Sequence, residues 1–395
     1  MKPICFFGAG LFLAIASHAA SPARLSFKSV TIDSNIQIGY GVTVADVDGD
    51  KKPDIILADK NQIVWYQNPG WEKHVIAENL TKLDHVCIAA MDIDGDGRAE
   101  LAAGAGWNPS DTLNSGAVFY LVPPADRTQR WTPVELPHEP TVHRMRWLKN
   151  REGRFDLIVA PLHGRGNNPG AGTGDGVKIL AYKKPADPKA PWKSEVVYAS
   201  FHKTHNIDPV FWDGASAQAL LVASKEGVFL LREIDGKWSP TQLAGAESGG
   251  AGEVRLGKLA AGRFLATVEP MHGTNLVLYT EPPHWDGKKL WQRKVLDSSL
   301  MDGHALACGD LARAGSDQIV VGWRAMGKPG AKVGIKLFTA TDSSGANWKE
   351  MLVDDNSMAC EDLCLADLDG DGRLDIIAAG RATKNVKIYY NRSEP

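Results

Sequence analysis

The sequence predicts an all-β protein: a seven-bladed β-propeller with four-stranded blades, in which the N-terminal strand completes the last blade. Two observations support this fold. A unit of strand, acidic loop and strand recurs seven times, and the last copy lacks a fourth strand that the N-terminal segment can supply. A closed ring removes the exposed edges of an open array, so the closing strand favours a propeller over a solenoid.

The repeated unit is clearest in three segments, where an apolar strand leads into an Asp-Gly loop and a second apolar strand follows. These segments are 44–58 (VADVDGDKKPDIILA), 90–104 (AMDIDGDGRAELAAG) and 365–380 (LADLDGDGRLDIIAAG). Degenerate copies at 146–160, 210–224, 256–269 and 308–322 bring the number to seven. Internal repetition of this kind is typical of propellers and related arrays.

Each unit continues with a third strand and, in all but the last, a fourth strand that opens near a tryptophan. We expect third strands at 63–67, 117–121, 177–182, 227–232, 275–279, 333–338 and 386–390. The fourth strands are expected to begin at Trp71, Trp131, Trp192, Trp238, Trp291 and Trp348. Apolar and polar residues alternate in these segments, as half-buried strands require. The segment SFKSVTID (26–33) matches the strand missing from the seventh unit.

The first twenty residues have the composition of a secretory signal peptide. Lys2 precedes an apolar run from Ile4 to Ile15, and small residues follow as far as Ala20. This order of charge, apolar core and small residues defines such signals, and the run is shorter than the roughly 20 residues that span a bilayer. We therefore expect residues 1–20 to be removed and residues 21–395 to form the propeller, secreted or periplasmic and not inserted in a membrane.

The overall charge offers no sign of a nucleic-acid partner. Lys and Arg number 44 against 47 Asp and Glu, a formal net charge of −3, whereas nucleic-acid and membrane-surface binding favour a basic surface. Four cysteines follow the signal: Cys87, Cys308, Cys360 and Cys364. A bridge from Cys308 to Cys360 or Cys364 suits an oxidising compartment, and buried free thiols fit equally well. We expect a monomer.

Twelve acidic residues occupy positions 1, 3, 5 and 9 of the three clearest loops. They are Asp46, Asp48, Asp50 and Asp54; Asp92, Asp94, Asp96 and Glu100; and Asp367, Asp369, Asp371 and Asp375. Converging carboxylates repel one another unless a hard cation neutralises them, and Ca²⁺ prefers six to eight oxygen ligands. Flanking helices and a Glu at position 12, the marks of an EF-hand, are missing. The sequence therefore predicts up to three structural calcium ions, and the alternative is a metal-free Asp/Gly turn.

The opposite face of the expected ring collects histidine and arginine, because the loops before the first strand and after the second strand of each blade both lie there. Candidate catalytic residues are His143, His163, His205, His272, Arg144 and Arg165, and candidate substrate-binding residues are His85, Trp107, Lys225, His304, Arg324 and Arg381. A single histidine at a strand end usually satisfies a local hydrogen bond. A set contributed by several blades around one axis instead predicts a ligand pocket.

This set of side chains suits β-elimination from a uronic acid or a keto sugar. A histidine that titrates near neutral pH can take the proton α to a carbonyl or carboxylate, and an arginine can hold the resulting anion. Trp107 can stack on a sugar ring, and three or four histidines can instead hold a further divalent metal such as zinc with an open position. The sequence thus predicts a carbohydrate-active lyase or dehydratase.

Two other functions remain open on the sequence alone. A non-catalytic, calcium-stabilised propeller could bind a glycan or a protein with the same face, although such a module does not need so many titrating groups. Glycoside hydrolysis by Glu253 and Glu361 ranks third, because in the expected ring these two carboxylates lie well apart.

The motif DxDGDGxxD between two strands resembles the FG-GAP, or VCBS-type, repeat propellers, which include integrin α-chain heads. This resemblance covers nearly all of the chain after residue 20 and implies the fold, but no activity. The strand end WYQNPGW (65–71) makes the chain similar to the propeller part of aldos-2-ulose dehydratase as well. The chain also looks like the seven-bladed lyases that cleave rhamnose from glucuronate, and both resemblances imply elimination chemistry on a carbohydrate.

Overall fold

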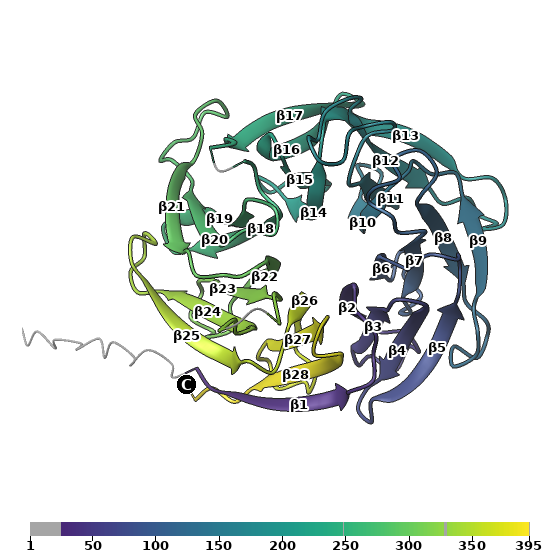
Figure 1. Ribbon diagram of the computed structural model, residues 1–395, viewed down its shortest axis with the longest axis horizontal. Coiled ribbons are helices and arrows are strands. Elements are labelled where there is room, and N and C mark those ends of the chain that lie inside the picture. The colour runs from purple at the N-terminus through teal and green to yellow at the C-terminus, as the bar shows by residue number, and fades with distance from the viewer. Residues whose placement is uncertain (1–24, 248, 328–329, 395) are drawn as a thin grey trace, which may run out of the picture.

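The chain forms a closed ring of seven antiparallel four-stranded sheets around a central axis (Figure 1). The computed structural model describes residues 25–247, 249–327 and 330–394. Every regular element within these ranges is a strand, and they contain no helix able to cross a membrane. The predicted seven-bladed propeller is therefore confirmed, whereas the predicted signal peptide at 1–20 lies outside the described residues.

The strands of each blade follow one another from the axis to the rim (Figure 1). Blade 1 consists of β2 (Gly41–Ala45), β3 (Asp54–Ala58), β4 (Gln62–Gln67) and β5 (Glu72–Glu78). Blade 2 consists of β6 (Cys87–Met91), β7 (Glu100–Ala105), β8 (Ala117–Val122) and β9 (Thr132–Leu136). Blade 3 consists of β10 (Val142–Lys149), β11 (Phe155–Pro161), β12 (Val177–Lys183) and β13 (Lys193–Phe201). Blade 4 consists of β14 (Thr204–Phe211), β15 (Gln218–Ser224), β16 (Gly227–Ile234) and β17 (Lys237–Ala244).

The remaining blades have the same order. Blade 5 consists of β18 (Glu253–Leu259), β19 (Gly262–Glu269), β20 (Asn275–Thr280) and β21 (Gln292–Asp297). Blade 6 consists of β22 (Gly303–Gly309), β23 (Gln318–Trp323), β24 (Gly334–Ala340) and β25 (Trp348–Asp355). Blade 7 consists of β26 (Cys360–Ala366), β27 (Asp375–Gly380), β28 (Asn385–Asn391) and β1 (Phe27–Asp33).

The N-terminal strand closes the ring as predicted. Strand β1 pairs antiparallel with β28, in a register that places Val30 opposite Ile388, and the two lie side by side at the rim in Figure 1. Ser26 extends this contact, because its carbonyl oxygen accepts a hydrogen bond from the Arg392 N–H at 2.8 Å. Blade 7 therefore combines strands from both ends of the described chain and closes the ring.

Apolar side chains on facing blades form the core. Between blades 1 and 2, for example, Ile56 and Trp65 pack in one cluster with Ile88 and Leu101, as expected where sheets stack face to face. All four described cysteines are free, so the disulfide considered above is not formed.

An asparagine at the end of the third strand ties neighbouring blades together. The backbone N–H of Asn68 donates to Asp54 Oδ1 at 2.8 Å, and the Asn68 side chain donates to the Leu368 carbonyl of blade 7 at 2.8 Å. Asn391 repeats the contact one blade earlier, donating to the Leu311 carbonyl at 2.9 Å. This is the structural purpose of the Asn in the WYQNPGW strand end.

Replacing Asn391 by Ala should lower the free energy of unfolding by about 2 kcal/mol, because a buried carbonyl that loses its partner costs roughly 1–3 kcal/mol. Asn391 is fully buried, so water cannot substitute for the lost amide. Urea titration of the variant against Asn114→Ala, a change in an exposed loop, measures the effect. Equal midpoints would show that the inter-blade contact contributes nothing.

Candidate functional site

The three Asp-Gly loops connect the first and second strands of blades 7, 1 and 2, which are consecutive in the ring. In each loop the carboxylates at positions 1, 3 and 5 converge, so that one oxygen from each lies within 4.8 Å of the others. The position-1 side chain also caps the loop: Asp46 accepts the N–H of Gly49 through one oxygen and that of Lys51 through the other, both at 2.7 Å. The backbone contacts are those of any Asp-capped turn, and the convergence of three carboxylates is the feature that a metal site would require.

The carboxylates at position 9 face inward. Asp54, Glu100 and Asp375 are buried, and Asp54 binds the backbone N–H of Val47 and of Asn68 at 2.9 and 2.8 Å. Burial raises the pKa of Asp54 and Glu100 to about 7 and that of Asp375 to about 6. None of the three belongs to the converging groups formed by positions 1, 3 and 5. Their observed contacts join the loop to the following strand.

The three loops differ in the ion pairs that their carboxylates form with nearby Lys and Arg side chains. Arg392 lies 2.7 Å from Asp369 and 3.1 Å from Asp371, and Lys52 lies 3.1 Å from Asp50. Within the described chain, the blade 2 loop of Asp92, Asp94 and Asp96 has no ion pair. A bound cation would therefore meet the least competition in blade 2.

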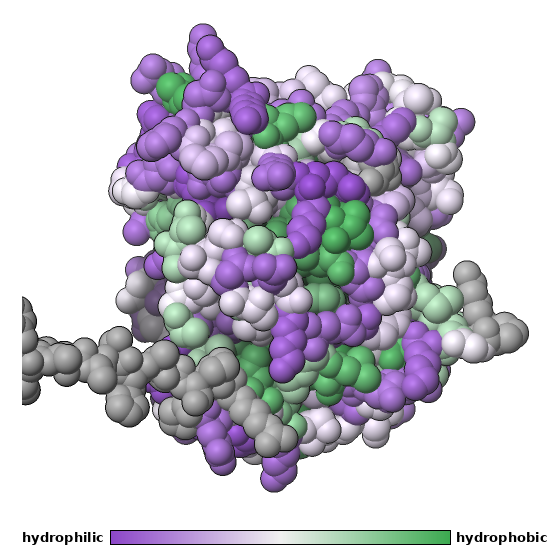
Figure 2. Space-filling model, turned by 90° about the vertical axis from the view of Figure 1, so that its left-hand side faces the viewer, coloured by the Kyte–Doolittle hydropathy of each residue, from purple (hydrophilic) through white to green (hydrophobic). Residues whose placement is uncertain are grey.

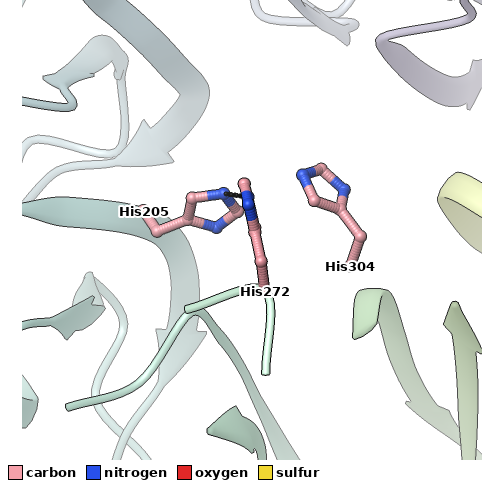
Figure 3. Close-up of side chains that lie close together, drawn as sticks. All are labelled: His205, His272 and His304. Carbon is pink, nitrogen blue, oxygen red and sulfur yellow. Dashed lines mark hydrogen bonds between the residues drawn. The ribbon is translucent and has the colours of Figure 1, made fainter. Parts of the chain in front are cut away.

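On the opposite side of the blades, four histidines from four consecutive blades meet. The ring centroids of His143 and His205 lie 4.6 Å apart, those of His205 and His272 4.8 Å, and those of His272 and His304 4.9 Å. Figure 3 shows His205, His272 and His304 pointing toward one another from separate segments. One nitrogen of each of these three lies within 4.8 Å of the other two. The set of His143, His205, His272 and His304 is called the histidine cluster below.

A β-bulge sets the direction of three of these side chains. The register between the first and second strands shifts around His143, around His205 and around His304, each of which is the extra residue of a β-bulge. The same shift occurs at Glu361 in blade 7. A bulge re-aims the side chain that it contains and is frequent beside active sites. In four blades, the same type of bulge therefore directs a polar side chain toward the site.

Backbone carbonyls fix the tautomers of three histidines. Nδ1 of His143 lies 3.0 Å from the His205 carbonyl oxygen, Nδ1 of His205 lies 2.9 Å from that of Gly252, and Nδ1 of His304 lies 2.5 Å from that of Glu361. A carbonyl oxygen only accepts, so each Nδ1 carries the proton and each Nε2 presents a lone pair. Arg144 Nη1 donates to the lone pair of His143 at 3.0 Å. The lone pair of His304 remains available to a ligand, whereas that of His205 faces Nε2 of His272.

His272 occupies a loop after β19 with a left-handed backbone (φ 58°), a conformation that is uncommon outside glycine. Its Nε2 lies 2.9 Å from Nε2 of His205, so His272 donates there while its Nδ1 accepts from Arg324 Nη2 at 3.4 Å. Asp302 Oδ1 lies 3.7 Å from the same Nδ1 and has no hydrogen-bond partner although it is buried. With the proton on Nδ1, His272 would satisfy Asp302 and free its own Nε2.

All four histidines of the cluster have a lowered pKa. Burial is the largest cause, followed by Arg144 for His143 and His205, by Arg324 for His304, and by His205 for His272. The expectation that these residues titrate near neutral pH is therefore wrong. They are neutral imidazoles at pH 7, which is the form that binds a metal.

Buried carboxylates neutralise the arginines around the cluster. Glu253 lies 3.7 Å from Arg144, and Glu361 lies 2.6 Å from Arg324 and 3.0 Å from Arg381. Each carboxylate is only 2% exposed and is held by a cation. This arrangement does not resemble the paired acid and base of glycoside hydrolysis, and it balances the charge of the predicted arginine clamp.

The structure also places the other predicted site residues. Trp107 joins the cluster, with its ring centroid 4.9 Å from that of His143. Arg165 is exposed and bonds to Glu139 and to the Leu113 carbonyl, away from the histidines.

Two predicted histidines are separate from the cluster. His85 is buried and its Nε2 accepts the Leu80 N–H at 3.3 Å, and His163 is buried with an unpartnered Nδ1. Neither makes a ring contact or side-chain hydrogen bond with the four clustered histidines anywhere in the described chain. The sequence placed both on the correct face, but it gave no information about the direction of their side chains.

His163 should make the fold sensitive to acid. Burial, and secondarily Lys203, lowers its pKa to about 4, against about 6.5 in the unfolded chain. Between pH 6.5 and 4 the unfolded state binds more protons, so stability falls as the pH falls through this window. Replacing His163 by Asn should reduce the loss of unfolding free energy between pH 7 and pH 5 by about 2 kcal/mol. Urea titrations at the two pH values test this, with the exposed His284→Asn as a control. A loss as large as that of the unchanged protein would contradict the assignment.

Sequence reasoning missed two residues of the site. Asp302 precedes His304 in the string MDGHA, which reads as an ordinary turn, and Lys203 precedes His205 in KTH. Lys203 lines a cavity of about 220 Å³ that His205 also lines, together with Lys225.

Comparison with known proteins supports both the repeat and the propeller. The FG-GAP-like repeat matches residues 46–103, and the aldos-2-ulose dehydratase β-propeller domain matches residues 115–282. Aldos-2-ulose dehydratase from Phanerodontia chrysosporium is 24% identical over 316 residues, which cover 72% of this chain and 34% of that protein. The chain thus matches about a third of the length of this relative. The chain is therefore a β-propeller that is similar to FG-GAP-like repeats over residues 46–103 and to the propeller of aldos-2-ulose dehydratase over residues 115–282.

Solved structures share the architecture only. A chain of the mitotic checkpoint complex superimposes with a TM-score of 0.57 at 11% identity, covering 98% of both chains. A chain from the complex of BBS1N with ARL6DN, soaked with mercury, gives 0.54 at 14% identity, covering 94% of this chain and 97% of that one. At such identities the likeness concerns the fold and not the function.

Proposed function

We propose that the protein is a carbohydrate-active lyase or dehydratase, which carries out β-elimination on a uronic acid or a keto sugar at a divalent metal bound by His205, His272 and His304. The observation that carries this proposal is the convergence of three neutral imidazoles, within 4.8 Å, at one site. The similarity to a sugar dehydratase supports the substrate class, since the matched residues 115–282 include His143, His205 and His272.

The residues present fit such a metal. Nδ1 of His205 and of His304 already donates to a backbone carbonyl, and the unpartnered Oδ1 of Asp302 can accept from Nδ1 of His272. Metal-bound histidines commonly have such partners, which orient the ring and fix the tautomer. Three histidine ligands with an open position are typical of catalytic zinc.

When bound, the metal would polarise the substrate carbonyl or carboxylate and so acidify the α-hydrogen. In the elimination, a base takes that hydrogen as a proton and the electron pair of the C–H bond forms the C=C bond. The C–O bond at the β-carbon breaks, and the departing oxygen takes up a proton from the protonated base or from water and leaves as water or an alcohol. Trp107 offers an aromatic face beside His143 for the sugar ring. Arg144 and Arg324 remain paired with Glu253 and Glu361, which keeps the charge around the site fixed.

Calcium has a separate, structural role in this proposal. Up to three Ca²⁺ ions would bind at Asp46, Asp92 and Asp367 and their neighbours at positions 3 and 5. The converging carboxylates fit a hard cation with oxygen ligands. These loops lie on the other side of the blades from the histidines, so the two kinds of metal would act independently.

We also propose that the protein acts as a secreted or periplasmic monomer. Figure 2 shows the flank that carries β21 and β25: it is mainly hydrophilic, and its apolar side chains form small separate patches. Leu290, Val295 and Leu352 are exposed there. A stable dimer formed through this flank would need a larger contiguous apolar surface.

An elimination assay tests the function. The purified protein, loaded with Zn²⁺, is incubated with uronate-containing oligosaccharides and with a keto sugar, and the ultraviolet absorbance of an unsaturated product is followed. Metal-dependent product would support the lyase. Binding of the sugar without product would support a non-catalytic glycan-binding propeller instead.

A further inference from the structure

A cavity beside the histidine cluster has a cationic lining. It measures about 220 Å³ and is lined by Lys203, His205 and Lys225, with Pro270 and Met271 on the blade 5 side. None of the described residues that line it is acidic. The cavity therefore has two ammonium groups beside a metal-facing histidine and no carboxylate to neutralise them.

The two lysines have different tasks. Lys225 Nζ donates to the carbonyl oxygens of Ala171 and Gly172 at 2.8 and 3.1 Å, and thereby fastens the glycine-rich loop after β11 over the cavity. Lys203 Nζ makes no hydrogen bond or ion pair with any residue that the structure describes. Lys203 is the cation that is free to bind a ligand.

The position of Lys203 is fixed by its surroundings. Its carbonyl accepts the Lys225 N–H at 2.9 Å, and a Cβ at Gly172 would lie 3.4 Å from Lys203 Cε and 3.5 Å from Lys225 Cδ. The two side chains therefore run past Gly172 together. Both ammonium groups line the same cavity, so an anion placed here would reduce the repulsion between them.

We propose that Lys203 binds an anionic group of the sugar, a carboxylate or a sulfate ester, and so makes the site selective for acidic over neutral sugars. This inference rests on the proposed function, because the anion subsite adjoins His205 of the metal site. It narrows the substrate class from uronic acids and keto sugars to sugars that carry a negative charge.

The test compares glucuronate with its uncharged methyl ester, by calorimetric titration of the zinc-loaded protein. Glucuronate is expected to bind about ten-fold more tightly than the ester, because a charge-assisted hydrogen bond in a half-buried site is worth that much. Lys203→Met should reduce the ratio to about one by weakening glucuronate alone, and Lys203→Arg should retain most of it. Lys60→Met changes an exposed lysine that follows the second strand of blade 1, and it should behave like the unchanged protein.

Glucose 6-sulfate separates the two sources of the anion. Tighter binding than glucuronate, lost in Lys203→Met, would identify a sulfate ester, and weaker binding would identify the carboxylate. A ratio near one in the unchanged protein, or an unaltered ratio in Lys203→Met, would overturn the inference, even if elimination occurs. A preference that depends on Lys203, in a protein that eliminates nothing, would retain the anion subsite and remove the lyase.

Discussion

Replacing His205 by Gln is expected to abolish binding of the proposed divalent metal and to lower the rate of the proposed elimination by about 10³-fold. His205 is central to the cluster: its ring contacts those of His143, His272 and His304. Loss of one of three ligands should reduce metal affinity by more than the roughly 10–100-fold that follows loss of an outer partner. A glutamine amide can still donate to the Gly252 carbonyl, so the buried hydrogen bond need not be lost. Metal content by atomic absorption and the initial rate, measured on the same samples, give the result.

Two further variants test whether metal affinity depends on the partner of His272 and on histidines of the cluster alone. Asp302→Asn leaves all three ligands in place but weakens the partner of His272, so metal affinity should fall about 10–100-fold with little change in melting temperature. His284→Gln, an exposed histidine outside the cluster, should keep full metal content and rate. Full metal content and full activity in His205→Gln would remove the proposed site.

The ring could be predicted because the sequence repeats one strand–loop–strand unit along its length. Seven copies of one unit and a spare strand at the N-terminus determine both the number of blades and the closure at β1 and β28. Topology alone then places His143, His205, His272 and His304 on one face. For these four residues the prediction of convergence is confirmed by ring distances of about 5 Å.

The sequence could not show which side chains turn toward the site. His163 and His272 both follow the second strand of a blade, yet only His272 reaches the cluster. The bulges at His143, His205 and His304 depend on strand register, which repeat spacing does not encode. The sequence also could not show how the fold changes the pKa of these histidines. Burial lowers the pKa of the clustered histidines, and burial is a property of the assembled ring.

Removal of calcium is expected to lower the melting temperature by several degrees, because a ligand that binds only the folded state at 100 times its Kd contributes about 2.7 kcal/mol. A loop in blade 6 serves as an internal control for the three Asp-Gly loops. In blade 6, Asp310 occupies position 1 and accepts the N–H of Ala314 and of Gly315 at 2.8 and 2.7 Å, but Ala312 and Ala314 stand at positions 3 and 5. An aspartate at position 1 therefore caps this type of loop without a full set of metal ligands.

The comparison of Asp94→Asn with Asp310→Asn separates metal binding from capping. Asp94 occupies position 3 of the blade 2 loop, is exposed and has no ion pair with any described residue, so its carboxylate has no partner to lose except the cation and one backbone N–H. Calorimetric melting with calcium and with EGTA should show Asp94→Asn lowering the transition only when calcium is present, and Asp310→Asn lowering it equally in both. Calcium, but not zinc, should restore the transition after EGTA, since zinc prefers nitrogen and sulfur ligands. An unchanged transition in EGTA, or an Asp94→Asn effect that persists there, would mean that these loops are Asp/Gly turns held by backbone hydrogen bonds alone.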